Sequence, residues 1–208
     1  MIEADNGVVN WWWIRHAPSA SAANIIHGRD AVSADLSDTD ALKNLTARLP
    51  TGAIALTSGI ARAVQTYEAI HSLNPALPTA QTEPDFAEQD FGDWTGRTWD
   101  DVAPAAPHFW DDPIETAPPN GESFAVSCRR VLRRIEAMSN TRKSGSIVCV
   151  AHAGTIRAAL ALALDLDFAA SIRFEIDPLS LTRIDAFVAE GGISWRVQSV
   201  NVDSSLGI

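Results

Sequence analysis

The sequence is poor in basic residues for its length. Of its 208 residues, 16 are lysine or arginine and 26 are aspartate or glutamate, so the formal net charge is −10. Nucleic acids and anionic membranes are bound through basic surfaces, and this balance argues against both as partners. It does not exclude a pocket for a small anion, because a pocket responds to the few charges around it.

Cysteines and long apolar runs are also scarce. Cys128 and Cys149 are too few for a disulfide framework, so we expect two buried free thiols. The apolar runs 8–14 and 156–164 are shorter than the roughly 20 residues that cross a bilayer. The first residues are acidic where a secretory signal is basic. We therefore expect a cytoplasmic protein without a membrane partner.

The chain contains enough apolar material, 46% of its residues, to build a sizeable core. Short β-favouring runs occur at 8–14, 54–57 and 147–151. Apolar side chains recur at helical spacing in three further stretches, 60–70, 124–138 and 156–164. Strands that alternate with helices are typical of α/β proteins. We predict one three-layer α/β/α domain over 1–208 with a mostly parallel central sheet, in which the adjacent tryptophans at 11–13 are strand and core residues.

The end of the chain has a different pattern. Residues 173–176, 179–187 and 193–202 read as alternating strands separated by turns, which predicts at least one antiparallel edge strand. Exposed sheet edges of this kind, and apolar helix faces, would suit a homodimer. A region rich in proline, alanine and acidic residues lies earlier, and we expect it to form a variable loop or cap at about 97–121.

Histidine and arginine side chains follow three separate predicted strands. Arg15 and His16 come after the first, Arg62 lies shortly after the second, and His152 follows the strand at 147–151. Ligands of open α/β sheets bind at the carboxyl ends of the strands. The arrangement therefore predicts an anion site at one edge of the sheet.

A phosphate monoester fits this set of side chains. Arginine matches phosphate oxygens with its planar fork, and helix starts offer free backbone N–H groups. A neutral imidazole can attack phosphorus and divide hydrolysis into two easier transfers. The leaving oxygen needs a proton, for which Glu88, Asp90 and Asp93 are equally well placed by spacing alone.

Five blocks in the sequence resemble the histidine phosphatase superfamily, which also contains the cofactor-dependent phosphoglycerate mutases. They are Arg-His-Ala-Pro at 15–18, the segment 57–66 with its Arg-Ala-Val-Gln-Thr, the segment 86–96, Gly-Glu-Ser-Phe at 121–124, and the segment 148–157 around the second histidine. The opening block and His-Gly-Arg-Asp at 27–30 look most like the branch that contains the α-ribazole phosphatases.

The resemblance implies a role for each matching position. It makes His16 the nucleophile and selects Glu88 as the proton donor. The phosphate-binding group that it implies consists of Arg15, Arg62, His152 and the backbone N–H of Ala153. His27 and Trp110, which lie in loops near these blocks, are candidates for contact with the rest of the substrate. The expected substrate is a small-molecule phosphate ester, and no metal or other cofactor is expected.

Two positions depart from the family pattern. Ala17 replaces the usual glycine beside the nucleophile, and Ala22 stands where many members have an asparagine. The second departure puts one phosphate contact in doubt and counts against mutase activity. A cluster of arginines in the predicted helix, residues 129, 130, 133 and 134, lies off the apolar stripe and is expected to face solvent.

Three other functions compete with hydrolysis. A phosphoglycerate-type mutase would share the fold, but such enzymes usually carry longer insertions before the second histidine. His16, His152 and Glu88 could form a two-histidine, one-carboxylate metal site, against which the two arginines argue by charge. A non-catalytic phospholigand-binding module would typically have lost a catalytic residue, and all of the expected ones are present.

Overall fold

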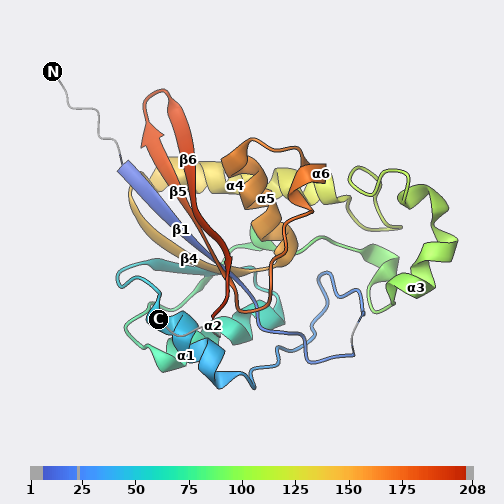
Figure 1. The fold of residues 1–208 in the computed structure, drawn as a ribbon, viewed down its shortest axis with the longest axis horizontal. Helices are drawn as coiled ribbons and strands as arrows, with labels where there is room; N and C mark the ends of the chain where they lie inside the picture. The colour runs from blue at the N-terminus through green and yellow to red at the C-terminus, as the bar shows by residue number, and fades with distance from the viewer. Residues whose placement is uncertain (1–6, 23, 205–208) are drawn as a thin grey trace.

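The computed structural model describes residues 7–22 and 24–204. Within them a single sheet has the strand order β3-β2-β4-β1-β5-β6 (Figure 1). Its strands are β1 Gly7–Arg15, β2 Ile54–Thr57, β3 Gln81–Thr82, β4 Gly145–Ala151, β5 Leu181–Ala189 and β6 Gly192–Val202. The four strands from β3 to β1 run parallel, whereas β5 is antiparallel to both β1 and β6. This confirms the predicted mostly parallel sheet with an antiparallel edge.

Helices cover both faces of the sheet (Figure 1). The helices of the described residues are α1 Thr39–Ala47, α2 Ala61–Leu73, α3 Trp99–Val102, α4 Phe124–Arg142, α5 Ala153–Leu164 and α6 Phe168–Ser171. Short 3-10 turns occur at Pro84–Phe86, Gly92–Trp94, Ala103–Ala105 and Pro107–Phe109. The helices α1 and α2 lie on one face, and α4 and α5 lie on the other.

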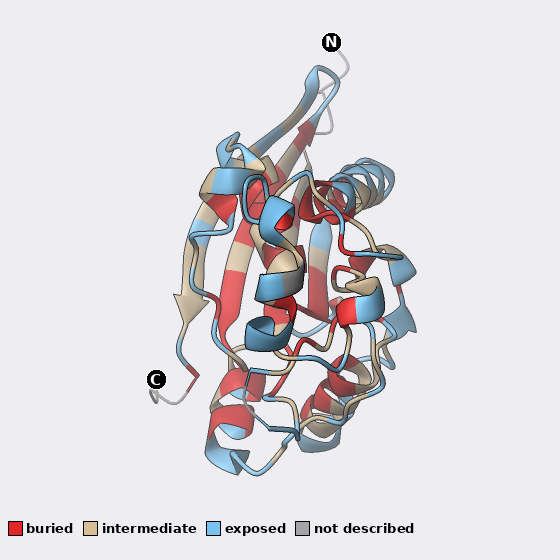
Figure 2. Cartoon of the chain, turned by 90° about the vertical axis from the view of Figure 1, so that its right-hand side faces the viewer, coloured by how far each residue is buried: buried red, intermediate tan, exposed pale blue. Residues whose placement is uncertain are grey.

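Successive side chains of a strand point to opposite faces of the sheet, so they belong to two separate hydrophobic cores. In β4, Val148 and Val150 pack with α1 and α2, whereas Ile147 and Cys149 pack with α4 and α5. Buried residues are concentrated on the strands and the inner helix faces, while the outer faces are exposed (Figure 2). Both cysteines are buried free thiols, as predicted. Within the part of the chain described, none of the helices combines the length and apolar character needed to cross a bilayer.

Tryptophans of β1 form the centre of the larger core. The rings of Trp11 and Trp13 are fully buried and stacked, with centroids 4.9 Å apart, and Phe86 meets both edge-on. The indole N–H of Trp11 donates to the hydroxyl of Ser139 in α4, at 3.0 Å. This bond satisfies the one polar atom of the ring and ties β1 to α4.

One predicted strand is absent: residues 173–176 form a turn and an irregular segment. Asp167 caps the short helix α6 just before them, with its side chain accepting from the N–H of Ala170. Backbone carbonyls of this segment accept from arginine side chains, Phe174 from Arg157 and Ile176 from Arg15, which leaves them no role in a ladder. The following strand begins at Leu181, because Leu179 has a left-handed φ of 58°.

The stacked tryptophan should contribute strongly to stability. We expect Trp11→Ala to lower the free energy of unfolding by about 3–5 kcal/mol, since it removes a fully buried ring and leaves a cavity. Trp110→Ala, at a position where the residue is 47% exposed, should cost less than about 1 kcal/mol. Urea unfolding followed by circular dichroism would compare them, and equal losses would contradict this account of the core.

Candidate active site

The ends of three neighbouring parallel strands bring the predicted histidines together. β1 leads into His16, β4 into His152 and β2 into Ser58, and these strands are adjacent in the order β2-β4-β1. The backbone N–H of His16 continues the ladder by donating to the carbonyl of Ala151 at 3.0 Å. As a result the two imidazole rings lie with centroids 5.0 Å apart.

Arg62 lies against both imidazoles. It is the second residue of α2 and is only 2% exposed. Its Nε donates to Nε2 of His16 at 3.1 Å, and its Nη2 lies 3.3 Å from Nδ1 of His152. Nη2 also donates to the carbonyl of Gly28 at 2.6 Å, and Nη1 lies 3.5 Å from the carboxylate of Asp30. The guanidinium is therefore held from several sides.

The contacts of His16 define its tautomer. Its Nδ1 lies 2.6 Å from the carbonyl of Ala17, which can only accept, so the proton is on Nδ1. Its Nε2 then carries the lone pair that accepts from Arg62. Burial, and next the charge of Arg62, lower the pKa of His16 to about 3. The ring is consequently neutral, with the lone pair of Nε2 directed at the guanidinium.

His152 is completely buried and also neutral. Burial lowers its pKa well below the ordinary value, and nearby His16 and Arg62 lower it further. Because Arg62 can only donate to Nδ1, the proton is on Nε2, which lies 2.8 Å from the hydroxyl of Ser58. In the structure His152 thus orients both Arg62 and Ser58.

A cavity of about 260 Å³ lies in front of these groups, and Arg15, His16, His27, Arg62 and Glu88 are among its lining residues. Burial lowers the pKa of both arginines, and Glu88 opposes that effect. Nη1 of Arg15 donates to the carbonyl of Ile176 at 2.5 Å. Two guanidinium groups and a neutral imidazole therefore border one cavity of a size that suits a phosphate group.

Of the three acids that spacing left open, Glu88 borders this cavity. Its carboxylate accepts from the backbone N–H of Gly154 at 3.3 Å, next to Ala153, the first residue of α5. A Cβ at Gly154 would overlap Oε1 of Glu88, so a side chain at this position would displace the carboxylate from where it lies. Asp90 instead accepts from the N–H of Gly92, and Asp93 from the side chain of Asn120.

A second cavity of about 450 Å³ adjoins the first. Glu88, Phe91 and Trp99 line both, and Trp110, Phe109 and Arg157 line only the second. Part of this wall comes from the segment 97–121, which lies at one end of the molecule (Figure 1). The two predicted substrate contacts are therefore divided, His27 bordering the first cavity and Trp110 the second.

His27 belongs to a chain of polar contacts. Its Nδ1 lies 2.9 Å from the carboxylate of Asp30, and its Nε2 lies 2.7 Å from the hydroxyl of Ser21. Asp30 also approaches Arg62. His27 is consequently connected to Arg62 through the carboxylate of Asp30.

Sequence reasoning gave no role to Glu122, which fixes the loop that carries Glu88. One carboxylate oxygen accepts from Arg29 at 2.6 Å, from Arg130 at 2.8 Å and from the N–H of Asp90 at 3.2 Å. The two arginines in turn donate to backbone carbonyls of the loop, Arg130 to residues 85 and 87 and Arg29 to residue 88.

The expectation that the arginine cluster of α4 faces solvent is therefore wrong for Arg130, whose side chain is only 14% exposed. The fourth resembling block, Gly-Glu-Ser-Phe, was the available signal for Glu122.

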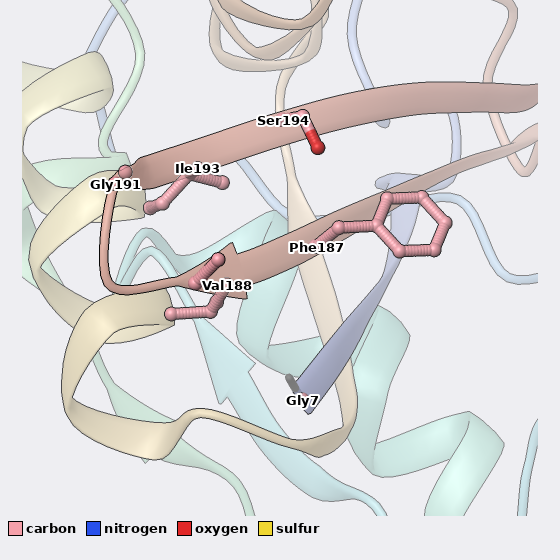
Figure 3. Close-up of a pocket in the computed structure, with 8 residues that line it drawn as sticks. Gly7, Phe187, Val188, Gly191, Ile193 and Ser194 are labelled. Carbon is pink, nitrogen blue, oxygen red and sulfur yellow. The ribbon is translucent and has the colours of Figure 1, made fainter. Parts of the chain in front are cut away.

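A further hollow, of about 490 Å³, lies at the tip of the β5–β6 hairpin (Figure 3). It is lined by small and apolar residues that include Gly7, Phe187 and Ile193. Gly7 begins the strand that ends at Arg15, so about 25 Å of extended chain separates this hollow from the histidines. It carries no charged side chain and does not share in the chemistry described above.

Known proteins resemble this chain in sequence and in fold. The family model described as histidine phosphatase superfamily (branch 1) matches residues 12–203. A bifunctional protein of Mycobacterium tuberculosis is 34% identical over 116 residues, which cover 54% of this chain and 32% of that protein. The match thus spans about a third of the length of the curated relative.

Solved structures agree closely with the fold. The alpha-ribazole phosphatase from Shigella flexneri has a TM-score of 0.79 at 23% identity, covering 96% of this chain and 98% of its own. A mycobacterial glucosyl-3-phosphoglycerate phosphatase has a TM-score of 0.79 at 20% identity, with 94% and 99% covered. YhfR of Bacillus stearothermophilus has a TM-score of 0.80 at 22% identity, with 95% and 100% covered.

At these identities the solved structures establish the fold alone. The family model matches residues 12–203, nearly the whole chain, and this match establishes the family. The protein belongs to branch 1 of the histidine phosphatase superfamily.

Proposed function

We propose that the protein hydrolyses small-molecule phosphate monoesters through a phosphohistidine formed on His16. The observation that carries the proposal is the directed lone pair of His16. Its Nδ1 proton is fixed by the carbonyl of Ala17, and its Nε2 accepts from Arg62 beside a cavity that His16 and two guanidinium groups border. A neutral imidazole held in this way is prepared to attack phosphorus.

In the first step the phosphate group enters the smaller cavity and accepts hydrogen bonds from Arg15 and Arg62. This gives the Nε–H of Arg62 an anionic acceptor in place of the imidazole and releases the lone pair of His16. The Nε2–phosphorus bond then forms as the bond from phosphorus to the alcohol oxygen breaks. Protonated Glu88 gives its proton to that leaving oxygen.

In the second step the roles reverse. The carboxylate of Glu88 takes a proton from water, the water oxygen bonds to phosphorus, and the bond to His16 breaks with its electron pair returning to Nε2. The two arginines stabilise the equatorial oxygens throughout, so the proposed reaction uses no metal or other cofactor. His152 keeps Arg62 and Ser58 in place, and a phosphate oxygen that reached its ring would replace one of these two partners.

Removal of the nucleophile tests the proposal directly. We expect His16→Ala to lower phosphate release from alkyl phosphates by about 10⁴-fold or more and to abolish an acid-labile, alkali-stable phosphoryl label on the wild-type chain. His108→Ala is the matched control, because its side chain is 95% exposed. Unchanged turnover in His16→Ala would refute the mechanism. Isomerised phosphate esters in place of free phosphate would indicate a mutase, and loss of wild-type activity in chelator would indicate a metal enzyme.

The neutral state of His16 should also appear in the pH dependence of stability. The pKa of the folded residue is about 3 against an ordinary 6.5, so the unfolded chain binds the proton more readily and stability is lost as the pH falls below 6.5. For one such residue the loss from pH 7 to pH 5 is about 2 kcal/mol. In urea unfolding, His16→Gln should lose that much less than the wild type over this interval, whereas His108→Gln should follow the wild type.

Glu122 is a positioning residue whose removal should displace the Glu88 loop. We expect Glu122→Ala to lower kcat/KM for alkyl phosphates by about tenfold, part of the 10²–10⁴-fold that a general acid contributes; kcat/KM is compared because it reports the first transfer, in which the leaving group takes its proton. Hydrolysis of 4-nitrophenyl phosphate should fall less, because its leaving group needs no proton. Glu115→Ala, which breaks an exposed pair with Arg129, is the control. Equal losses for both substrates would mean that Glu122 acts on folding alone.

A further inference from the structure

The second cavity meets the first at Glu88, and the alcohol part of a substrate would begin next to that residue. The alcohol carbon is bonded to the oxygen that Glu88 would protonate, and Glu88 lines both cavities. With phosphate against the arginines in the smaller cavity, the alcohol extends past Glu88, Phe91 and Trp99 into the larger one. Its volume of about 450 Å³ is within the range of sites for small molecules.

Aromatic rings dominate the wall of this larger cavity. Phe91 and Trp99 meet edge-to-face at 5.7 Å between centroids, Trp99 and Trp110 at 5.7 Å, and Phe109 and Trp110 at 5.1 Å. Trp99 is 37% exposed and Trp110 47% exposed. These rings therefore present uncovered apolar surface at the entrance, and a flat aromatic group would bury it with favourable ring contacts.

Part of the polar wall is already engaged by the protein. The side chain amide of Gln89 donates to the carbonyl of Glu122, the N–H of Gly154 to Glu88, and Nε of Arg157 to the carbonyl of Phe174. A sugar would bring several hydroxyl groups against a wall that is mainly aromatic and offers few polar partners, and each hydroxyl left without a partner is costly. An aromatic group makes no such demand, and the guanidinium of Arg157 can lie against its face.

We propose that the substrates are phosphate monoesters of alcohols that carry a flat aromatic group, held between Phe91, Trp99 and Trp110. This inference rests on the proposed function, since it takes Glu88 as the acid at the leaving oxygen. Catalysis and selection of the alcohol are thereby assigned to adjoining cavities that share one carboxylate.

The test compares three primary phosphates whose leaving alcohols are similar in basicity: 2-phenylethyl phosphate, ethyl phosphate and glucose 6-phosphate. We expect kcat/KM of the wild type to be at least about tenfold higher for the first than for either of the others. Trp110→Ala should lower the ratio of 2-phenylethyl to ethyl phosphate by about fivefold or more, which is the scale of one aromatic contact. Leu73→Ala, an exposed apolar position outside both cavities, is the control and should keep the wild-type ratio.

Binding separates this inference from the proposed function. Titration of the His16→Ala variant with 2-phenylethyl phosphate, followed by calorimetry, should show tighter binding than ethyl phosphate and a negative heat-capacity change. Equal kcat/KM for all three esters, or an unchanged ratio in Trp110→Ala, would overturn the aromatic assignment while hydrolysis stands. Selective binding without turnover or phosphoryl label in the wild type would overturn the proposed function and leave the assignment of the cavity intact.

Discussion

A single buried guanidinium determines the arrangement of the site. Arg62 is almost inaccessible to solvent, and an isolated charge in such a position is costly. The protein offsets this cost with the carbonyl of Gly28, the carboxylate of Asp30 and two neutral imidazoles. Because both histidines are uncharged, they accept from Arg62 and do not repel it. The same charge that the fold must stabilise is the one that the proposed reaction uses on phosphate.

The sheet supplies the geometry that this guanidinium needs. Parallel pairing places the ends of β1, β4 and β2 next to one another, so His16 and His152 meet although 136 positions separate them. The tight core behind them limits how far these ends can move, since Trp11 and Trp13 lie fully buried in the strand that ends at Arg15. Positional precision at the site is therefore a consequence of packing several residues away.

The parts of the fold and of the site that depend on local pattern could be predicted, and those that depend on long-range partners could not. Strand ends and helix starts are visible in the sequence, which is why Arg15, His16, Arg62 and His152 were gathered correctly on one edge of the sheet. The choice of Glu88 required a resemblance, because its orientation follows from Gly154, 66 positions away. The ion pair of Glu122 with Arg130 also depends on tertiary contacts, as do the carbonyls of Phe174 and Ile176 that accept from arginines. These contacts join segments that the spacing of apolar residues does not relate to one another.

The two cavities meet at Glu88, but their lining residues are under different chemical constraints. Groups around the smaller cavity must keep their charge, tautomer and spacing, because each would act on the phosphorus or its oxygens. In the proposed reaction the larger cavity would contact only the part of the substrate that leaves, and much of its wall comes from the segment 97–121, which contains short turns and one four-residue helix. Changes in that wall can alter which alcohol fits without moving Arg62 or His16. A fold built in this way can retain one reaction while its substrates diverge, provided that Glu88 stays at the boundary between the two cavities.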